Sequence, residues 1–179
     1  YGHPAMPQNA ENDILKGMYL LREGGNGNSD NRLHVQLLGA GTILREVIAA
    51  SELLEADYNI CADIWSVTSF NELRREALDV LRWNMLHPDQ SARFSHVENC
   101  LKNRQGPVIA ASDYMKIYAD QIREFVPGKY RVLGTDGFGR SDTREKLRHF
   151  FEVDRYYIVV ATLKVLSEEG KIAHEEVIE

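Results

Sequence analysis

Hydrophobic and polar positions follow two different periods along this chain, and each change of period marks a new element. Short apolar runs have the length of buried strands and occupy residues 33–38, 60–67, 108–111 and 130–133. Apolar residues recurring every three to four positions predict helices over residues 43–54, 70–87, 91–102, 113–125 and 143–151. Strands that alternate with helices predict an α/β three-layer sandwich with a mostly parallel sheet of about five strands.

Polar residues at the expected helix starts support these boundaries. Ser69 with Glu72, and Asp142 with Glu145, have the spacing of a capping box, in which side chains bond the free backbone groups of the first turn. Ser91 is expected to begin a further helix.

The apolar run at residues 156–163 fits a strand or a helix by its period alone. The segment around it is long, Asp154 stands before it as a cap, and Gly170 follows it. These features favour a helix, and a short last helix is expected over residues 172–178.

The first thirty residues are expected to be a linker with a flexible glycine-rich loop, followed by one domain over residues 31–179. Residues 10–20 are expected to form a short helix, and residues 23–30 are too polar and glycine-rich to pack. The chain starts at Tyr1, with two prolines in its first seven residues, so we interpret it as a piece of a longer polypeptide.

Composition narrows the classes of function. The net charge is −6 and the basic residues are scattered, which argues against a nucleic-acid surface. No stretch approaches the roughly 20 apolar residues that span a membrane, and no signal peptide opens the chain. Cys61 and Cys100 form no CxxC pair, which is typical of reduced thiols in a cytoplasmic protein.

The glycine-rich segment at residues 134–142 carries the strongest candidate chemistry. It follows a predicted strand, and ligands and partners of open α/β sheets bind at that edge. Our candidates for an interdomain or ligand-binding loop are Asp136, Phe138, Arg140, Ser141 and Asp142. The favoured interpretation is structural: Asp142 caps the next helix, and Asp136 and Arg140 pair with each other or with a neighbouring domain. Direct ligand binding is the alternative.

Other motifs indicate no self-sufficient catalytic machinery. Gly39 and Gly41 resemble the start of a dinucleotide fingerprint, but Leu44 stands where its third glycine belongs, so we interpret a structural turn. Asp63 has the spacing of a ribose-binding acid but lies inside a predicted strand. The six histidines have no metal-ligand spacing, and neither a GxSxG elbow nor a Walker loop occurs. We therefore expect no catalytic, cofactor-binding or metal-binding residue.

Several segments resemble the C-terminal part of the single-chain pyruvate dehydrogenase E1 family. The most specific are RWNMLHP at residues 82–88 and YRVLGTDGFGRSD at residues 130–142. Shorter matching segments are PAMP, KGMY, VQLLG, SVTSF and SDYMK at residues 4–7, 16–19, 35–39, 66–70 and 112–116.

The resemblance implies a transketolase C-terminal-domain-like fold within a homodimeric enzyme. In that family the N-terminal and middle domains bind thiamine diphosphate and Mg²⁺, and the enzyme decarboxylates pyruvate and reductively acetylates the lipoyl acetyltransferase E2. The implied partners are those two domains, the second E1 subunit and E2. The GDG…N cofactor motif is absent, so the resemblance implies a structural domain that holds no cofactor and is inactive alone. The alternatives are a stand-alone α/β ligand-binding module and the C-terminal domain of another transketolase-type 2-oxo acid enzyme.

Overall fold

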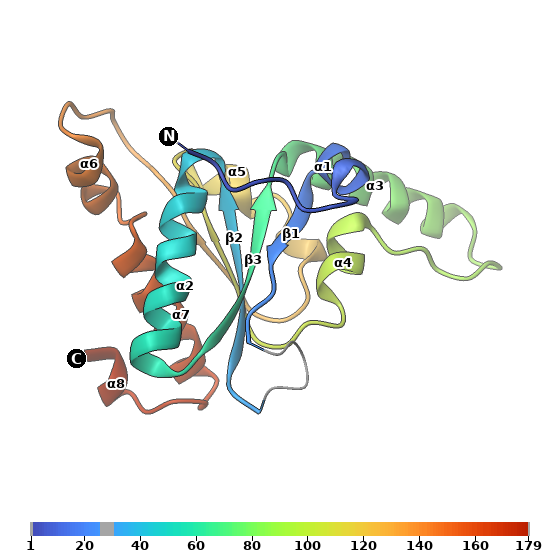
Figure 1. Cartoon of the computed structure of the whole chain (residues 1–179). Coiled ribbons are helices and arrows are strands. Elements are labelled where there is room, and N and C mark those ends of the chain that lie inside the picture. The colour runs from blue at the N-terminus through green and yellow to red at the C-terminus, as the bar shows by residue number, and fades with distance from the viewer. Residues whose placement is uncertain (1, 26–30, 179) are drawn as a thin grey trace.

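The computed structural model describes residues 2–25 and 31–178 and contains one five-stranded sheet with helices on both faces (Figure 1). The strands run in the order β1-β3-β2-β4-β5. Their bounds are Met18–Arg22 for β1, Cys61–Val67 for β3, His34–Ala40 for β2, Val108–Ala111 for β4 and Tyr130–Leu133 for β5. Every neighbouring pair is parallel except β1 with β3. The predicted mostly parallel α/β sheet is confirmed.

The antiparallel edge strand β1 was not predicted. The helix expected over residues 10–20 is α1 (Glu11–Lys16), which stops at Gly17. Gly17 has a φ of +108°, in the region that favours glycine, and its N–H bonds back to the last turn of α1. Residues 18–22 therefore belong to the sheet and not to the expected linker. Residues 26–30 of the expected flexible loop lie outside the described residues.

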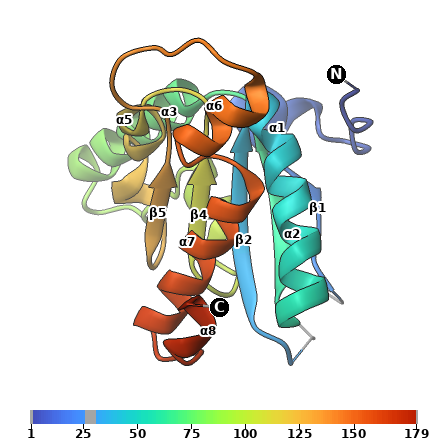
Figure 2. The same ribbon diagram turned by 90° about the vertical axis from the view of Figure 1, so that its left-hand side faces the viewer.

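Alternation along the strands divides the core between two faces of the sheet. On β2, Val35 and Leu37 face one hydrophobic cluster and Leu38 faces the other. The first cluster is covered by α2 (Leu44–Tyr58) and α7 (Arg155–Glu168), which lie in front of the sheet in Figure 2. The second is covered by α3 (Phe70–Leu86), α4 (His96–Leu101), α5 (Lys116–Asp120) and the 3₁₀ turn η3 (Arg123–Phe125).

Two helix starts agree with the capping residues. The Ser69 side chain accepts a hydrogen bond from the Glu72 backbone N–H at 3.1 Å, while the Glu72 side chain pairs with Arg75, so half of the predicted box forms. The Asp154 side chain accepts bonds from the first backbone N–H groups of α7. The helical interpretation of residues 156–163 is confirmed.

Two other starts are wrong by a few residues. The next helix begins at His96 and not near Ser91, because Ser95 and Glu98 form the complete capping box. Thr143 rather than Asp142 is the N-cap of α6 (Arg144–Phe150). In both places a residue of the same capping class stands closer to the first turn.

The C-terminal segment closes the fold beside α7. The short helix α8 (Glu175–Ile178) follows α7, within the expected range. Across residues 2–25 and 31–178, none of the helices has both the length and the apolar character needed to cross a bilayer.

Candidate functional site

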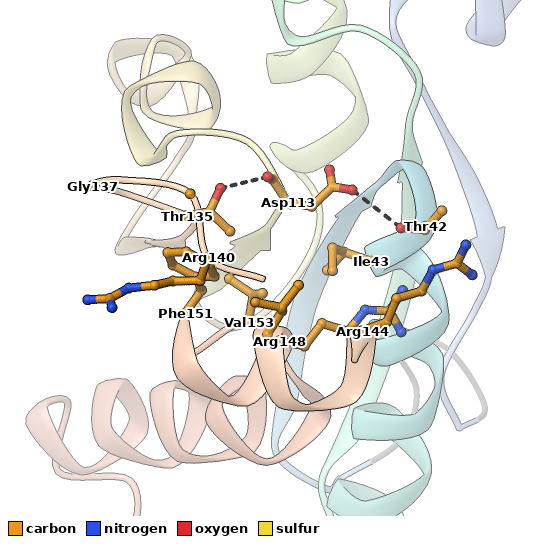
Figure 3. Close-up of a pocket in the computed structure, with 12 residues that line it drawn as sticks. Thr42, Ile43, Asp113, Thr135, Gly137, Arg140, Arg144, Arg148, Phe151 and Val153 are labelled. Carbon is orange, nitrogen blue, oxygen red and sulfur yellow. Dashed lines mark hydrogen bonds between the residues drawn. The ribbon is translucent and has the colours of Figure 1, made fainter. Parts of the chain in front are cut away.

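A cavity of about 510 Å³ opens at the carboxyl edge of the sheet (Figure 3). β2 and β4 are neighbours in the sheet. After β2 the chain turns away from β4 to form β3, and after β4 it turns away from β2 to form β5. Loops that diverge from neighbouring parallel strands leave a crevice between them, which is the usual binding position in open α/β sheets. Residues that follow β2, β4 and β5 line this cavity together with α6.

Hydrogen bonds across the cavity tie the three strand-end loops together. The Thr42 hydroxyl, after β2, donates to the Asp113 carboxylate, after β4, at 3.3 Å. The Thr135 hydroxyl, after β5, donates to the Asp113 backbone carbonyl at 2.6 Å. Ile43 and Val153 add buried apolar surface. These two bonds make the floor of the cavity a junction of three loops.

Three arginines surround the cavity, and they extend in different directions. In Figure 3 the side chain of Arg140 extends away from the centre of the cavity, and Arg144 and Arg148 extend towards the opposite side. The guanidinium of Arg140 lies 5.1 Å from the centre of the Phe150 ring, in cation–π geometry. The arginines therefore form a rim, and they do not converge on one point as a single phosphate site requires.

A buried carboxylate holds α6 and α7 against α2. The side chain of Glu46 is 8% exposed and accepts a bond from the guanidinium of Arg148 at 2.8 Å. It also accepts bonds from the Arg155 side chain at 3.0 Å and the Arg155 backbone N–H at 3.2 Å. Burial by itself would raise the pKa of Glu46, but the hydrogen bonds and charge of Arg155, with the charge of Arg148, lower it overall. This ionised junction links three helices beside the cavity.

The first residues of the 134–142 segment are anchored to the loop after β4. The Asp136 carboxylate accepts a bond from the Lys116 backbone N–H at 3.0 Å, at the first residue of α5. The Thr135 N–H donates to the Tyr114 carbonyl at 2.8 Å. A Cβ on Gly134 would lie 2.7 Å from that same carbonyl oxygen, so only glycine allows this approach. The helix expected over residues 113–125 therefore begins only at Lys116, because the residues before it are held in this loop; it also ends early, at Asp120, before the turn η3.

The later residues of the segment face outward. The side chain of Phe138 is almost completely exposed, at 95%, and Ser141 is exposed as well. The carboxylate of Asp142 accepts a bond from the N–H of Thr143, the residue that caps α6. Asp136 bonds to α5 and Arg140 stacks on Phe150, so these two side chains do not pair with each other. Their pairing with a neighbouring domain stays a prediction.

The remaining motif residues have structural surroundings. A Cβ on Gly39 would lie 2.8 Å from the Cα of Leu44, so this glycine allows β2 and α2 to pack closely. The buried carboxylate of Asp63 accepts bonds from the Gln36 side chain and the Gly24 backbone N–H. Within the described parts of the chain, no group of three or more His, Cys, Asp and Glu residues is placed to hold a metal ion.

Sequence patterns missed the residues that build this region. Glu46 lies 102 residues before Arg148 and 109 before Arg155. Thr42 and Asp113, 71 residues apart, form another pair with no local motif. An acid in the first turn of a helix is common for electrostatic reasons, so Glu46 carried no recognisable signal.

Comparison with known proteins agrees with the geometry. Residues 17–154 match the family model of the transketolase-like C-terminal domain. The chain belongs to this family. The transketolase of Leishmania mexicana has the same fold, with a TM-score of 0.57 and 13% identity over 90% of this chain and 20% of that one.

Relatives of higher identity are pyruvate dehydrogenase E1 components. The protein of Pseudomonas aeruginosa is 59% identical over the whole of this chain, and that of Escherichia coli K12 is 51% identical over 96% of it. The chain spans only 20% and 19% of their respective lengths. It therefore matches a transketolase-like C-terminal region of E1 components, and the resemblance noted in the sequence is confirmed.

Proposed function

We propose that this chain is the C-terminal domain of a pyruvate dehydrogenase E1 component, and that its role there is structural. The observation that carries the proposal is 59% identity over the whole chain to an E1 component five times as long, of which the chain covers 20%. The complete enzyme would act in the cytoplasm, decarboxylate pyruvate with thiamine diphosphate and Mg²⁺, and reductively acetylate the lipoyl group of E2. Its other partners would be the N-terminal and middle domains and the second E1 subunit.

Two carboxylates near the cavity, and a cysteine thiol on α4 away from it, support a structural role. Asp113 is bonded to Thr42, and Glu46 is held by two arginines that lower its pKa, so it stays ionised and paired at neutral pH. Burial raises the pKa of the Cys100 thiol to about 11, which leaves almost no thiolate to act as a nucleophile. The carboxylates of Asp113 and Glu46 thus join loops and helices, and a thiol that stays protonated is a poor nucleophile.

The residues of the cavity do not fit thiamine diphosphate and its metal. A bound Mg²⁺ needs carboxylate or carbonyl oxygens together with the diphosphate, whereas the residues that line this cavity include one carboxylate, Asp113, and the arginines diverge. We therefore derive no catalytic step from this chain, and we assign the cofactor to the remainder of the complete polypeptide.

Two measurements test the proposal. The complete polypeptide should decarboxylate pyruvate when supplied with thiamine diphosphate and Mg²⁺. Calorimetric titration of the 179-residue chain with the same cofactor and metal should give no binding heat. Turnover or tight cofactor binding by the 179-residue chain would contradict the structural role, and an inactive complete polypeptide would contradict the assignment to E1.

The cavity itself favours a second candidate, a stand-alone ligand-binding module. Its volume of about 510 Å³ and its place at the carboxyl edge suit a small molecule. A panel of small carboxylates and phosphates titrated into the 179-residue chain discriminates, because only this candidate predicts saturable binding. The third candidate, another transketolase-type 2-oxo acid enzyme, predicts that the complete polypeptide prefers a 2-oxo acid other than pyruvate.

A further inference from the structure

Exposed aromatic and basic side chains gather beside the cavity, on the 134–142 segment and α6. We infer that this surface, which we call the docking face (Phe138, Arg140, Arg144 and Phe150), binds an acidic surface on the part of the complete polypeptide that precedes residue 1. The inference rests on the proposed function, since it requires that the chain is one domain of a longer enzyme.

The aromatic residues are the first reason. Phe138 is 95% exposed near the tip of its loop, and Phe150 on α6 is 57% exposed. Each large aromatic side chain buries a large apolar area when it is covered, and aromatic residues are enriched in protein interfaces. Two of them on adjoining segments, around a cavity with an apolar floor, are suited to contact another protein surface.

Charge is the second reason. The whole chain has a net charge of −6, yet the exposed residues of segment 140–148 include three basic side chains, Arg140, Arg144 and Lys146, and two acidic ones. Arg148 of the same segment is paired with the buried Glu46. A locally positive face on a negative domain favours an acidic partner, because complementary charges orient surfaces as they meet.

The path of the chain is the third reason, because it places the preceding polypeptide at this edge. Gly2, His3 and Pro4 line a cavity together with Arg148 and Arg155, next to the Glu46 junction. Figures 1 and 2 show the N-terminus at the carboxyl end of the sheet, near the start of α2. The E1 relatives are about five times as long as this chain, which matches their transketolase-like C-terminal region. The preceding part therefore approaches next to the docking face.

The outward direction of the rim favours a protein surface over a small ligand. Arg140 extends away from the cavity centre in Figure 3, and Phe138 is held out in solvent. A small molecule bound between the loops would not reach both of these side chains, whereas a broad facing surface would contact them together.

Hydrogen exchange in the complete polypeptide tests the inference. Docking should make amide hydrogen exchange over residues 134–151 slower in the complete polypeptide than in the 179-residue chain. In the complete polypeptide, the double variant Arg140→Glu, Arg144→Glu should speed this exchange by roughly tenfold. Reversing two exposed charges replaces two weak attractions by repulsions, each worth about a few-fold in the docking equilibrium. The matched control is Lys129→Glu, Lys171→Glu, which makes the same charge change near the amino edge of the sheet and should leave this exchange unchanged. Phe138→Ala should also speed amide exchange over residues 134–151, without altering the charge of the chain.

The outcomes separate this inference from the proposed function. If the complete enzyme decarboxylates pyruvate but neither Phe138→Ala nor the arginine variant changes exchange over residues 134–151, the docking face is wrong and the proposed function stands. If both variants speed exchange in a polypeptide without that activity, docking stands and the proposed function fails. Protection of the same residues in the 179-residue chain by inorganic phosphate or acetate alone would assign the face to a small anion and overturn the inference.

Discussion

Replacing Glu46 with glutamine removes the charge at the centre of the three-helix junction and keeps the side-chain size. In the native chain the carboxylate accepts four side-chain and backbone bonds from Arg148 and Arg155. A neutral amide accepts fewer of them and removes the negative charge of Glu46 from the Arg148 guanidinium, which is only 15% exposed. Removal of one partner from a buried ion pair is costly because the other charge stays in a poorly solvated site.

The expected loss of unfolding free energy is about 2 kcal/mol. Charge-assisted hydrogen bonds contribute about 1.5–3 kcal/mol each, but Arg155 is partly solvated and recovers much of its share from water. For a domain of this size, about 2 kcal/mol lowers Tm by roughly 4–8 °C in calorimetry of the 179-residue chain. Amide hydrogen exchange over α6 should also become faster. None of the residues of α6 is buried, and the Arg148–Glu46 ion pair is a main contact that holds this helix against α2.

The pH dependence follows from the direction of the pKa shift. Since the folded-state pKa of Glu46 lies below its ordinary value of 4.5, the stabilisation is fully present above pH 4.5 and is lost as the pH falls through the folded value. The difference in stability between the native chain and Glu46→Gln should therefore be constant at neutral pH and shrink below about pH 4.5. A difference that grows on acidification would refute the assigned sign.

The matched control lies on the same helix. Glu52 is 65% exposed and 3.8 Å from Arg22, so Glu52→Gln should change the unfolding free energy by less than about 0.5 kcal/mol. If Glu46→Gln lowers Tm no more than this control does, the ion pairs of Glu46 with Arg148 and Arg155 do not stabilise the fold.

Three further changes test the loops around the cavity. Asp136→Ala should cost about 1 kcal/mol in denaturant unfolding, because it removes a helix-capping acceptor, and Asp136→Asn should recover most of the loss. Gly134→Ala should cost at least about 2 kcal/mol, because its Cβ would meet backbone atoms at 2.7 Å and 2.8 Å, whereas a Cβ on Gly139 meets nothing within 4 Å and that alanine variant should be nearly neutral. Cys100 should react with iodoacetamide far more slowly at pH 8 than a free thiol does, because burial raises its pKa to about 11; rapid labelling would show that the thiol is accessible and ionised.

Much of the fold follows from local patterns. The four parallel strands β2 to β5 and the helices α2, α3 and α7 were predictable because apolar spacing and caps act within a few residues. The edge strand β1 was missed because its five residues suit a helix or a strand, and pairing with β3, more than forty residues away, decides between them. The helix expected over residues 113–125 starts late, at Lys116, for a similar reason, since contacts from Thr135 and Asp136 hold the residues before it.

The candidate site, too, was predictable from the sequence only in part. Glycine spacing and charge identified residues 134–142 from the sequence, because loops that follow parallel strands are restricted in where they lie. The roles of Asp136 and Arg140 depended on neighbours supplied by other segments, a backbone N–H of α5 and the ring of Phe150. Sequence determined most of the strands and helices, though not β1 or the break in the 113–125 helix, and it determined which loop reaches the carboxyl edge. Only the tertiary structure decided which charges meet, because a buried ion pair such as Glu46 with Arg148 depends on the packing of helices a hundred residues apart.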